Sequence, residues 1–77
     1  MTIETAQTLD ARHLSCPMPI VKTAIAMKAM GSGQLLEVLA TDPGSVKDFA
    51  AWAQTTGNVL LASNVQDGVY RFVLQKK

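Results

Sequence analysis

The residue in this sequence best suited to covalent chemistry is Cys16, the only cysteine among the 77 residues. A lone cysteine is often just a small buried apolar side chain, but Cys16 is predicted to lie in a loop directly before a helix, where backbone N–H groups and the helix dipole favour a thiolate. A thiol with a pKa of about 8.5 is only about 3 per cent ionised at pH 7, whereas a pKa of about 7 would ionise half of it. The dipole contributes roughly 0.3 to 1 kcal/mol, less than one pKa unit, so it cannot supply that shift alone.

Two prolines follow the thiol in the tetrapeptide Cys16-Pro17-Met18-Pro19. Neither proline has an N–H, so the donors left in the first helical turn are those of Met18 and Ile20, and stabilisation of a thiolate there is modest. Each proline also biases the preceding residue toward extended conformations, so the helix is predicted to begin at Pro17 or at Pro19. We expect Pro17, Met18 and Pro19 to shape the site by fixing the thiol beyond the end of the helix.

Three other polar residues are candidates for this site. Arg12 in the approach loop and Lys22 in the helix could stabilise a thiolate, although each could instead be a solvated surface charge. His13 is interpreted as a loop residue rather than a catalytic base, because nothing in the sequence fixes it against Cys16. One cysteine and one histidine cannot complete a structural zinc site in a single chain, so we expect no metal. No organic cofactor is expected either.

Elements of regular structure must position this loop. Residues 1–7 are predicted to be a flexible N-terminal tail and residues 8–11 a first strand. A helix then extends to about residue 30, where the glycines of residues 31–33 end it. Its apolar stripe has helical spacing: Ile20, Thr23/Ala24, Met27 and Met30. Val21 and Ile25 fall beside that stripe, and they either widen the contact with the core or present apolar surface to a partner.

The second half of the chain repeats the alternation of strand and helix. Residues 34–40 are predicted to form a strand that points Leu36, Val38 and Ala40 to one face. Asp42 or Ser45 would cap a second helix that ends at residues 55–57. Its predicted buried stripe is Val46, Phe49, Ala50 and Ala53. Strands at residues 59–65 and 69–74 flank an Asp-Gly pair, which is a strong hairpin signal.

The resulting order βαβαββ predicts an α/β (α+β) fold. Helices that alternate with strands imply crossover connections, and the closing hairpin adds antiparallel pairing. We therefore expect a two-layer sandwich in which a four-stranded mixed sheet carries both helices on one face. Residues 8–77 would form this single domain.

Charge and composition exclude several classes of function. The formal net charge is +1, and the seven basic residues are scattered, so direct binding of nucleic acid is not expected. The apolar runs are too short to span a bilayer, and the N-terminal residues lack the pattern of a secretory signal, so we expect no membrane association and a cytoplasmic location.

Several segments together resemble the TusA/SirA-like family of sulfur carriers. They are residues 9–11, the segment Leu14 to Pro19 with its Cys-Pro-x-Pro box, Gly33, residues 40–45, Trp52 and residues 70–72. The resemblance implies the βαβαββ sandwich and a cysteine that accepts sulfane sulfur as a persulfide. It also implies a donor, either a cysteine desulfurase or a rhodanese, and an acceptor, either a DsrE-like protein or a thiolation enzyme.

The implied pathways are tRNA thiolation, molybdenum-cofactor biosynthesis and sulfur oxidation. Two residues depart from the family pattern: His13 stands where many members have glycine, and Met18 stands where tRNA-thiolation members tend to have an acidic residue. The sequence thus indicates a sulfurtransferase-type carrier that acts with partner enzymes. Because no second cysteine can resolve a persulfide internally, the sulfur would stay on Cys16 until a partner arrives. The alternatives are a regulatory protein-interaction module with a structural cysteine, and a redox-sensing thiol that forms sulfenic acid.

Overall fold

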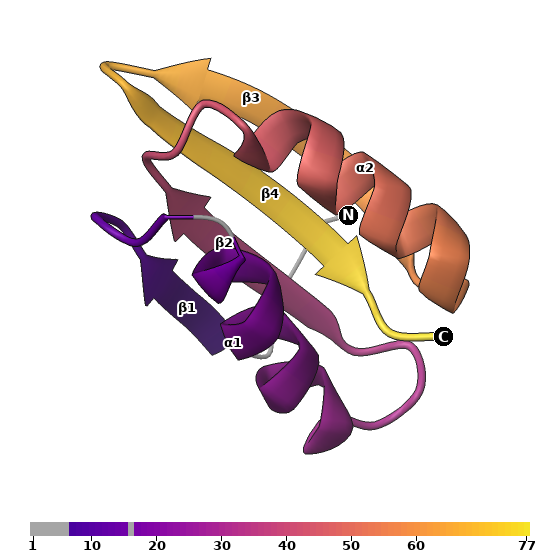
Figure 1. Cartoon of the computed structure of the whole chain (residues 1–77). Helices are drawn as coiled ribbons and strands as arrows, with labels where there is room; N and C mark the ends of the chain where they lie inside the picture. Colours follow the sequence, from indigo (N-terminus) through magenta and orange to yellow (C-terminus); the bar gives the residue numbers. More distant parts are fainter. Residues whose placement is uncertain (1–6, 16) are drawn as a thin grey trace.

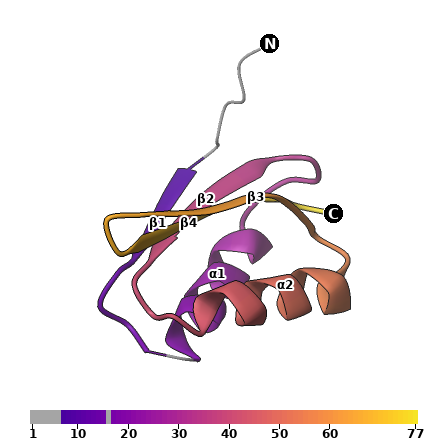
Figure 2. The same cartoon turned by 90° about the horizontal axis from the view of Figure 1, so that it is seen from above.

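The structure is a computed structural model that describes residues 7–15 and 17–77. Its elements are β1 (Gln7–Ala11), α1 (Met18–Lys28), β2 (Leu35–Ala40), α2 (Ser45–Thr56), β3 (Val59–Gln66) and β4 (Val69–Gln75). Figure 1 shows the two helices side by side in front of the sheet, and Figure 2 shows from above that both lie on the same face. The predicted order βαβαββ and the two-layer sandwich are confirmed. Of the predicted tail, only Gln7 is described, and it is the first residue of β1.

The sheet has the strand order β1-β2-β4-β3 and mixes parallel and antiparallel pairs. β1 pairs with β2 in parallel, and β4 pairs with both β2 and β3 in antiparallel orientation. The β3–β4 hairpin turns on Asp67 and Gly68, with φ angles of 52° and 78°. Positive φ at both central residues is the requirement of the type I′ turn that Asp-Gly predicts.

The core lies between the sheet and the helices. Phe49 of α2 stacks on Phe72 of β4 with ring centroids 4.6 Å apart, and both rings are fully buried. The residues predicted for the inner face of β2, Leu36, Val38 and Ala40, are also fully buried. From α1 and the residues after it, Thr23, Met27 and Met30 face this core, as their helical spacing predicts.

The end of α1 differs from the prediction. The helix ends at Lys28, and its C-cap is Ala29 in a right-handed conformation, not a glycine. The left-handed glycine comes later, at Gly33, where φ is 86° and the N–H donates to the carbonyl of Lys76 at 2.8 Å. Gly33 therefore serves the turn into β2 beside the end of the chain, so the glycine cluster marks the loop and not the helix cap.

The start and the buried face of α2 also need correction. The N-cap is Gly44, without a side-chain hydrogen bond, so neither Asp42 nor Ser45 fills that role. Ser45 is the first helical residue, and it is buried together with Phe49 and Ala53. Val46 and Ala50, predicted to be buried, are exposed because the inward face follows this spacing of four residues. The predicted end is confirmed, with Gly57 as a left-handed C-cap whose N–H donates to the carbonyl of Ala53.

Candidate functional site

The start of α1 is held firmly against the body of the protein. Pro17 is the N-cap residue, Met18 begins the helix, and Pro19 is buried, so the start lies between the two predicted alternatives. The N–H of Met18 donates to the carbonyl of Ser15 at 2.9 Å. The buried hydroxyl of Thr23 donates to the carbonyl of Pro19 at 2.8 Å. Pro19 costs no hydrogen bond here, because the first N–H groups of a helix have no partner within it.

Cys16 itself lies outside the described residues, and the residues beside it are at the surface. Ser15 and Pro17 are both exposed, and the Met18 side chain is 42% exposed. Pro17, Met18 and Pro19 of the Cys-Pro-x-Pro box stand at the N-terminal end of α1. The buried Pro19 anchors the box to the core.

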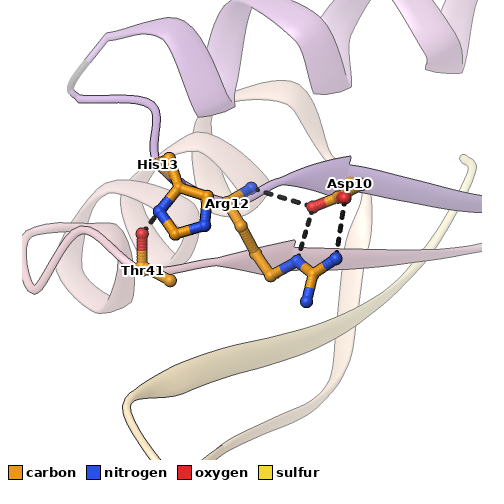
Figure 3. A network of polar contacts seen from close by, with 4 residues as sticks. All are labelled: Asp10, Arg12, His13 and Thr41. Carbon is orange, nitrogen blue, oxygen red and sulfur yellow. Dashed lines mark hydrogen bonds and ion pairs between the residues drawn. The ribbon is translucent and has the colours of Figure 1, made fainter.

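The loop that leads to the box adopts an unusual backbone conformation at His13. Its φ angle is 67°, in the left-handed region that residues with a Cβ seldom adopt. The N–H of His13 donates to the hydroxyl oxygen of Thr41 at 2.9 Å, which ties this loop to the one that precedes α2 (Figure 3). The sequence did not predict this contact. The glycine that the resemblance implies for many members at this position is a signal for the left-handed backbone alone.

Arg12 is paired with Asp10 of β1. Its Nε and Nη2 donate to the two carboxylate oxygens at 2.9 and 3.0 Å, and its backbone N–H donates to the same carboxylate at 3.1 Å (Figure 3). These hydrogen bonds lower the pKa of Asp10 to about 2 and raise the pKa of Arg12. The guanidinium is thus already engaged by a carboxylate, and a role for Arg12 at the thiolate stays a prediction.

Lys22 lies on the exposed side of α1, one helical turn after Met18. Within residues 7–15 and 17–77, it has no ion-pair partner. Its charge is therefore available at the surface that begins at the Cys-Pro-x-Pro box. A direct effect of Lys22 on the thiolate stays a prediction.

Three apolar side chains form an exposed row along α1, here called the α1 apolar stripe: Met18, Val21 and Ile25. They are 42%, 40% and 63% exposed and are spaced three and four residues apart, so they share one helix face. The interpretation that Val21 and Ile25 only widen the contact with the core is therefore wrong. The stripe begins at the Cys-Pro-x-Pro box and runs along the outer side of the helix.

No helix formed by the described residues is long and apolar enough to cross a membrane.

The fold and the cysteine box define a class of small α+β proteins, and comparison with known proteins gives the family. The profile of the family described as sulfurtransferase TusA matches residues 7–76. The chain belongs to this family, as its Cys-Pro-x-Pro box and its βαβαββ order indicated.

Relatives and a solved structure agree with this assignment. The chain is 51% identical over 70 residues to the sulfur carrier protein TusA of Allochromatium vinosum. This alignment covers 91% of this chain and 92% of that protein. It is 47% identical over 68 residues to the putative sulfur carrier protein YrkF of Bacillus subtilis, covering 88% of this chain but 37% of that protein. A crystal structure of a SirA-like protein from Desulfitobacterium hafniense superimposes with a TM-score of 0.80 at 24% identity, covering 90% of this chain and 95% of that one. This last likeness confirms the fold.

Proposed function

We propose that Cys16 is the residue on which this chain carries sulfur, as a persulfide. Membership of the TusA family makes the chain a sulfur carrier in a sulfur relay. The observation that carries the proposal is that the chain has a single cysteine, and that this cysteine stands in the Cys-Pro-x-Pro box. A thiol is the side chain that can hold a sulfane sulfur atom reversibly, because thiol–disulfide exchange leaves it unchanged at the end of the cycle.

The proposed reaction is an exchange between sulfur atoms with no net oxidation. The Cys16 thiolate attacks the terminal sulfur of a donor persulfide, or the sulfane sulfur of thiosulfate. A new S–S bond forms at Cys16 while the old one breaks, and its electron pair leaves on the donor thiolate or on sulfite. An acceptor thiolate then attacks the terminal sulfur and releases the Cys16 thiolate. Neither step needs a metal or an organic cofactor.

The surroundings of the box support contact with another protein's sulfur. Ser15 and Pro17 on either side are exposed, and Pro19 is buried, so the segment is anchored at one point and open at the others. Anchoring limits the conformational entropy lost when a partner binds. The lack of a second cysteine means that the persulfide waits for an external thiol.

The α1 apolar stripe is the proposed docking surface for the donor and the acceptor. It begins at Met18, two residues after Cys16, and Lys22 stands beside it. A partner that fits this surface would present apolar side chains with acidic residues at the edge, because charge complementarity speeds and orients weak encounters. The contact would be small and transient, as a relay with successive partners requires.

The class of partner follows from the family. We propose a cysteine desulfurase or a rhodanese as the donor, and a DsrE-like protein or a thiolation enzyme as the acceptor. The pathway would be tRNA thiolation, molybdenum-cofactor biosynthesis or sulfur oxidation. The cytoplasm is the proposed location, because thiols are kept reduced there.

Intact-mass spectrometry after incubation with a persulfide-loaded cysteine desulfurase tests the loading step. The wild-type chain is expected to gain the mass of one sulfur atom, and dithiothreitol is expected to remove it. Cys16→Ser should gain nothing, and wild-type protein alkylated beforehand should behave in the same way. If Cys16→Ser gains the same adduct, the proposal is wrong. A chain that gains oxygen from peroxide but no sulfur from any donor would instead favour the redox-sensing alternative.

A further inference from the structure

A cleft lies at the far end of α1 from the Cys-Pro-x-Pro box. It opens between the C-terminal halves of the two helices and the end of the chain, with a volume of about 380 Å³. Figure 1 shows the C-terminal end of the chain beside the end of α2. Pockets that bind small molecules have volumes of about 300 to 1,000 Å³, so this cleft is large enough for a small ligand.

The lining of the cleft is strongly basic. Lys28 of α1 and both residues at the end of the sequence, Lys76 and Lys77, contribute to it, and none of the described residues that line it is acidic. The C-terminal ends of the two helices each oppose this with about half a negative charge. The α-carboxylate of Lys77 adds one more negative charge, so about one of the three positive charges remains uncompensated, which favours an anion over a neutral ligand.

Contacts of Lys76 and Lys77 place these two residues at the cleft. The ammonium group of Lys76 donates to the carbonyl of Met27, which leaves its other N–H groups free for a ligand. The backbone N–H of Lys77 donates to the side-chain carbonyl of Asn58 at 2.8 Å. The stem of Lys77 passes over Gly57, with its Cδ 3.0 Å from where a Cβ would stand. A glycine at position 57 thus leaves room for this lysine.

The cleft also contains an aromatic ring. Trp52 of α2 contributes to the lining and is only partly buried. An indole ring can stack on a planar ligand, and stacking on an aromatic side chain contributes about 0.5 to 1.5 kcal/mol beyond the area that is buried. We propose that this cleft is a binding site for a small organic anion that combines a planar ring with a phosphate or carboxylate group. No part of this proposal depends on sulfur transfer at Cys16.

Fluorescence titration with adenosine 5′-monophosphate tests the proposal, because Trp52 is the only tryptophan in the chain. The nucleotide is expected to quench Trp52 saturably. Adenosine, which has the ring alone, and inorganic phosphate, which has the charge alone, should each bind about tenfold more weakly. The indole N–H resonance of Trp52 should shift on titration, which locates the ligand. Absence of saturation up to about 10 mM nucleotide, which corresponds to a binding free energy of only about 2.7 kcal/mol, would overturn the proposal.

Variants that remove one positive charge distinguish binding in the cleft from attraction of the nucleotide to the protein's net charge. Lys28→Gln and Lys77→Gln are each expected to weaken binding about fivefold, close to the effect of losing one charge contact in water. Lys47→Gln is the matched control, since Lys47 is exposed in the first turn of α2 and does not line the cleft. It removes the same charge and should change binding less than twofold. Equal weakening in all three variants would show attraction to net charge and contradict the site.

Discussion

Replacing His13 with glycine should stabilise the protein. His13 has a φ angle of 67°, and its imidazole forms no hydrogen bond with the described part of the chain. A residue with a Cβ loses about 1 to 2 kcal/mol in the left-handed region, whereas the extra flexibility of glycine in the unfolded chain costs about 0.5 to 1 kcal/mol. The difference predicts a gain of about 0.5 to 1 kcal/mol in the free energy of unfolding. The hydrogen bond from the His13 N–H to Thr41 is retained, because it uses the backbone.

Urea unfolding followed by the fluorescence of Trp52 measures this gain. For a domain of this size the denaturant slope is about 1 kcal/mol/M, so the midpoint should rise by about 0.5 to 1 M with an unchanged slope. His13→Ala is the matched control, since it removes the ring but keeps the Cβ that causes the strain. It should stay within about 0.5 kcal/mol of the wild type. If alanine stabilises as much as glycine, or if glycine destabilises, the backbone at residue 13 is not strained and the reasoning fails.

Three further predictions concern docking, packing and pH. Val21→Ser in the α1 apolar stripe should slow sulfur transfer from a loaded desulfurase severalfold in a stopped-time mass assay, whereas Val65→Ser, an exposed valine on β3, should not; equal rates for both variants would remove the stripe from docking. Ser45→Ala should raise the free energy of unfolding by about 1 kcal/mol in urea titration, because the buried Ser45 hydroxyl has no hydrogen-bond partner among residues 7–15 and 17–77; a loss of stability would mean that this oxygen is satisfied in solution. The pKa of Asp10 is lowered from 3.8 to about 2 by hydrogen bonds from Arg12, so its contribution to stability is present above pH 4 and is lost as the pH falls toward 2. Asp10→Asn should therefore flatten the decline of the thermal midpoint between pH 4 and pH 2, and an unchanged decline would contradict the pairing.

The fold could be predicted from the sequence because its signals are local and agree with one another. Alternation in β2 placed Leu36 and Val38 on the buried face, and the Asp67-Gly68 pair marked the closing hairpin. The prediction of where α1 ends is wrong because glycine occurs both at helix caps and in turns. The glycines of residues 31–33 predict a helix cap, but Gly33 serves a turn that contacts the distant Lys76.

The candidate site was predictable only in part. The Cys-Pro-x-Pro box at the start of a helix follows from residue types and spacing, whereas the burial of Pro19 is a finding of the structure. The pairing of Arg12 with Asp10 and the contact of His13 with Thr41 depend on side-chain direction and on two loops that meet in space. The exposure of Ile25 likewise depends on how α1 rotates against the sheet, which apolar spacing alone left open.

Transfer of labelled sulfur tests the central claim most directly. The chain is loaded with ³⁵S from a labelled desulfurase, separated from the donor, and mixed with an unlabelled acceptor protein that offers a free thiol. We predict that the label leaves this chain and appears on the acceptor, and that Cys16→Ser passes none. Label that never loads onto Cys16, or that stays on it while a competent acceptor thiol is present, would contradict a carrier role for this residue.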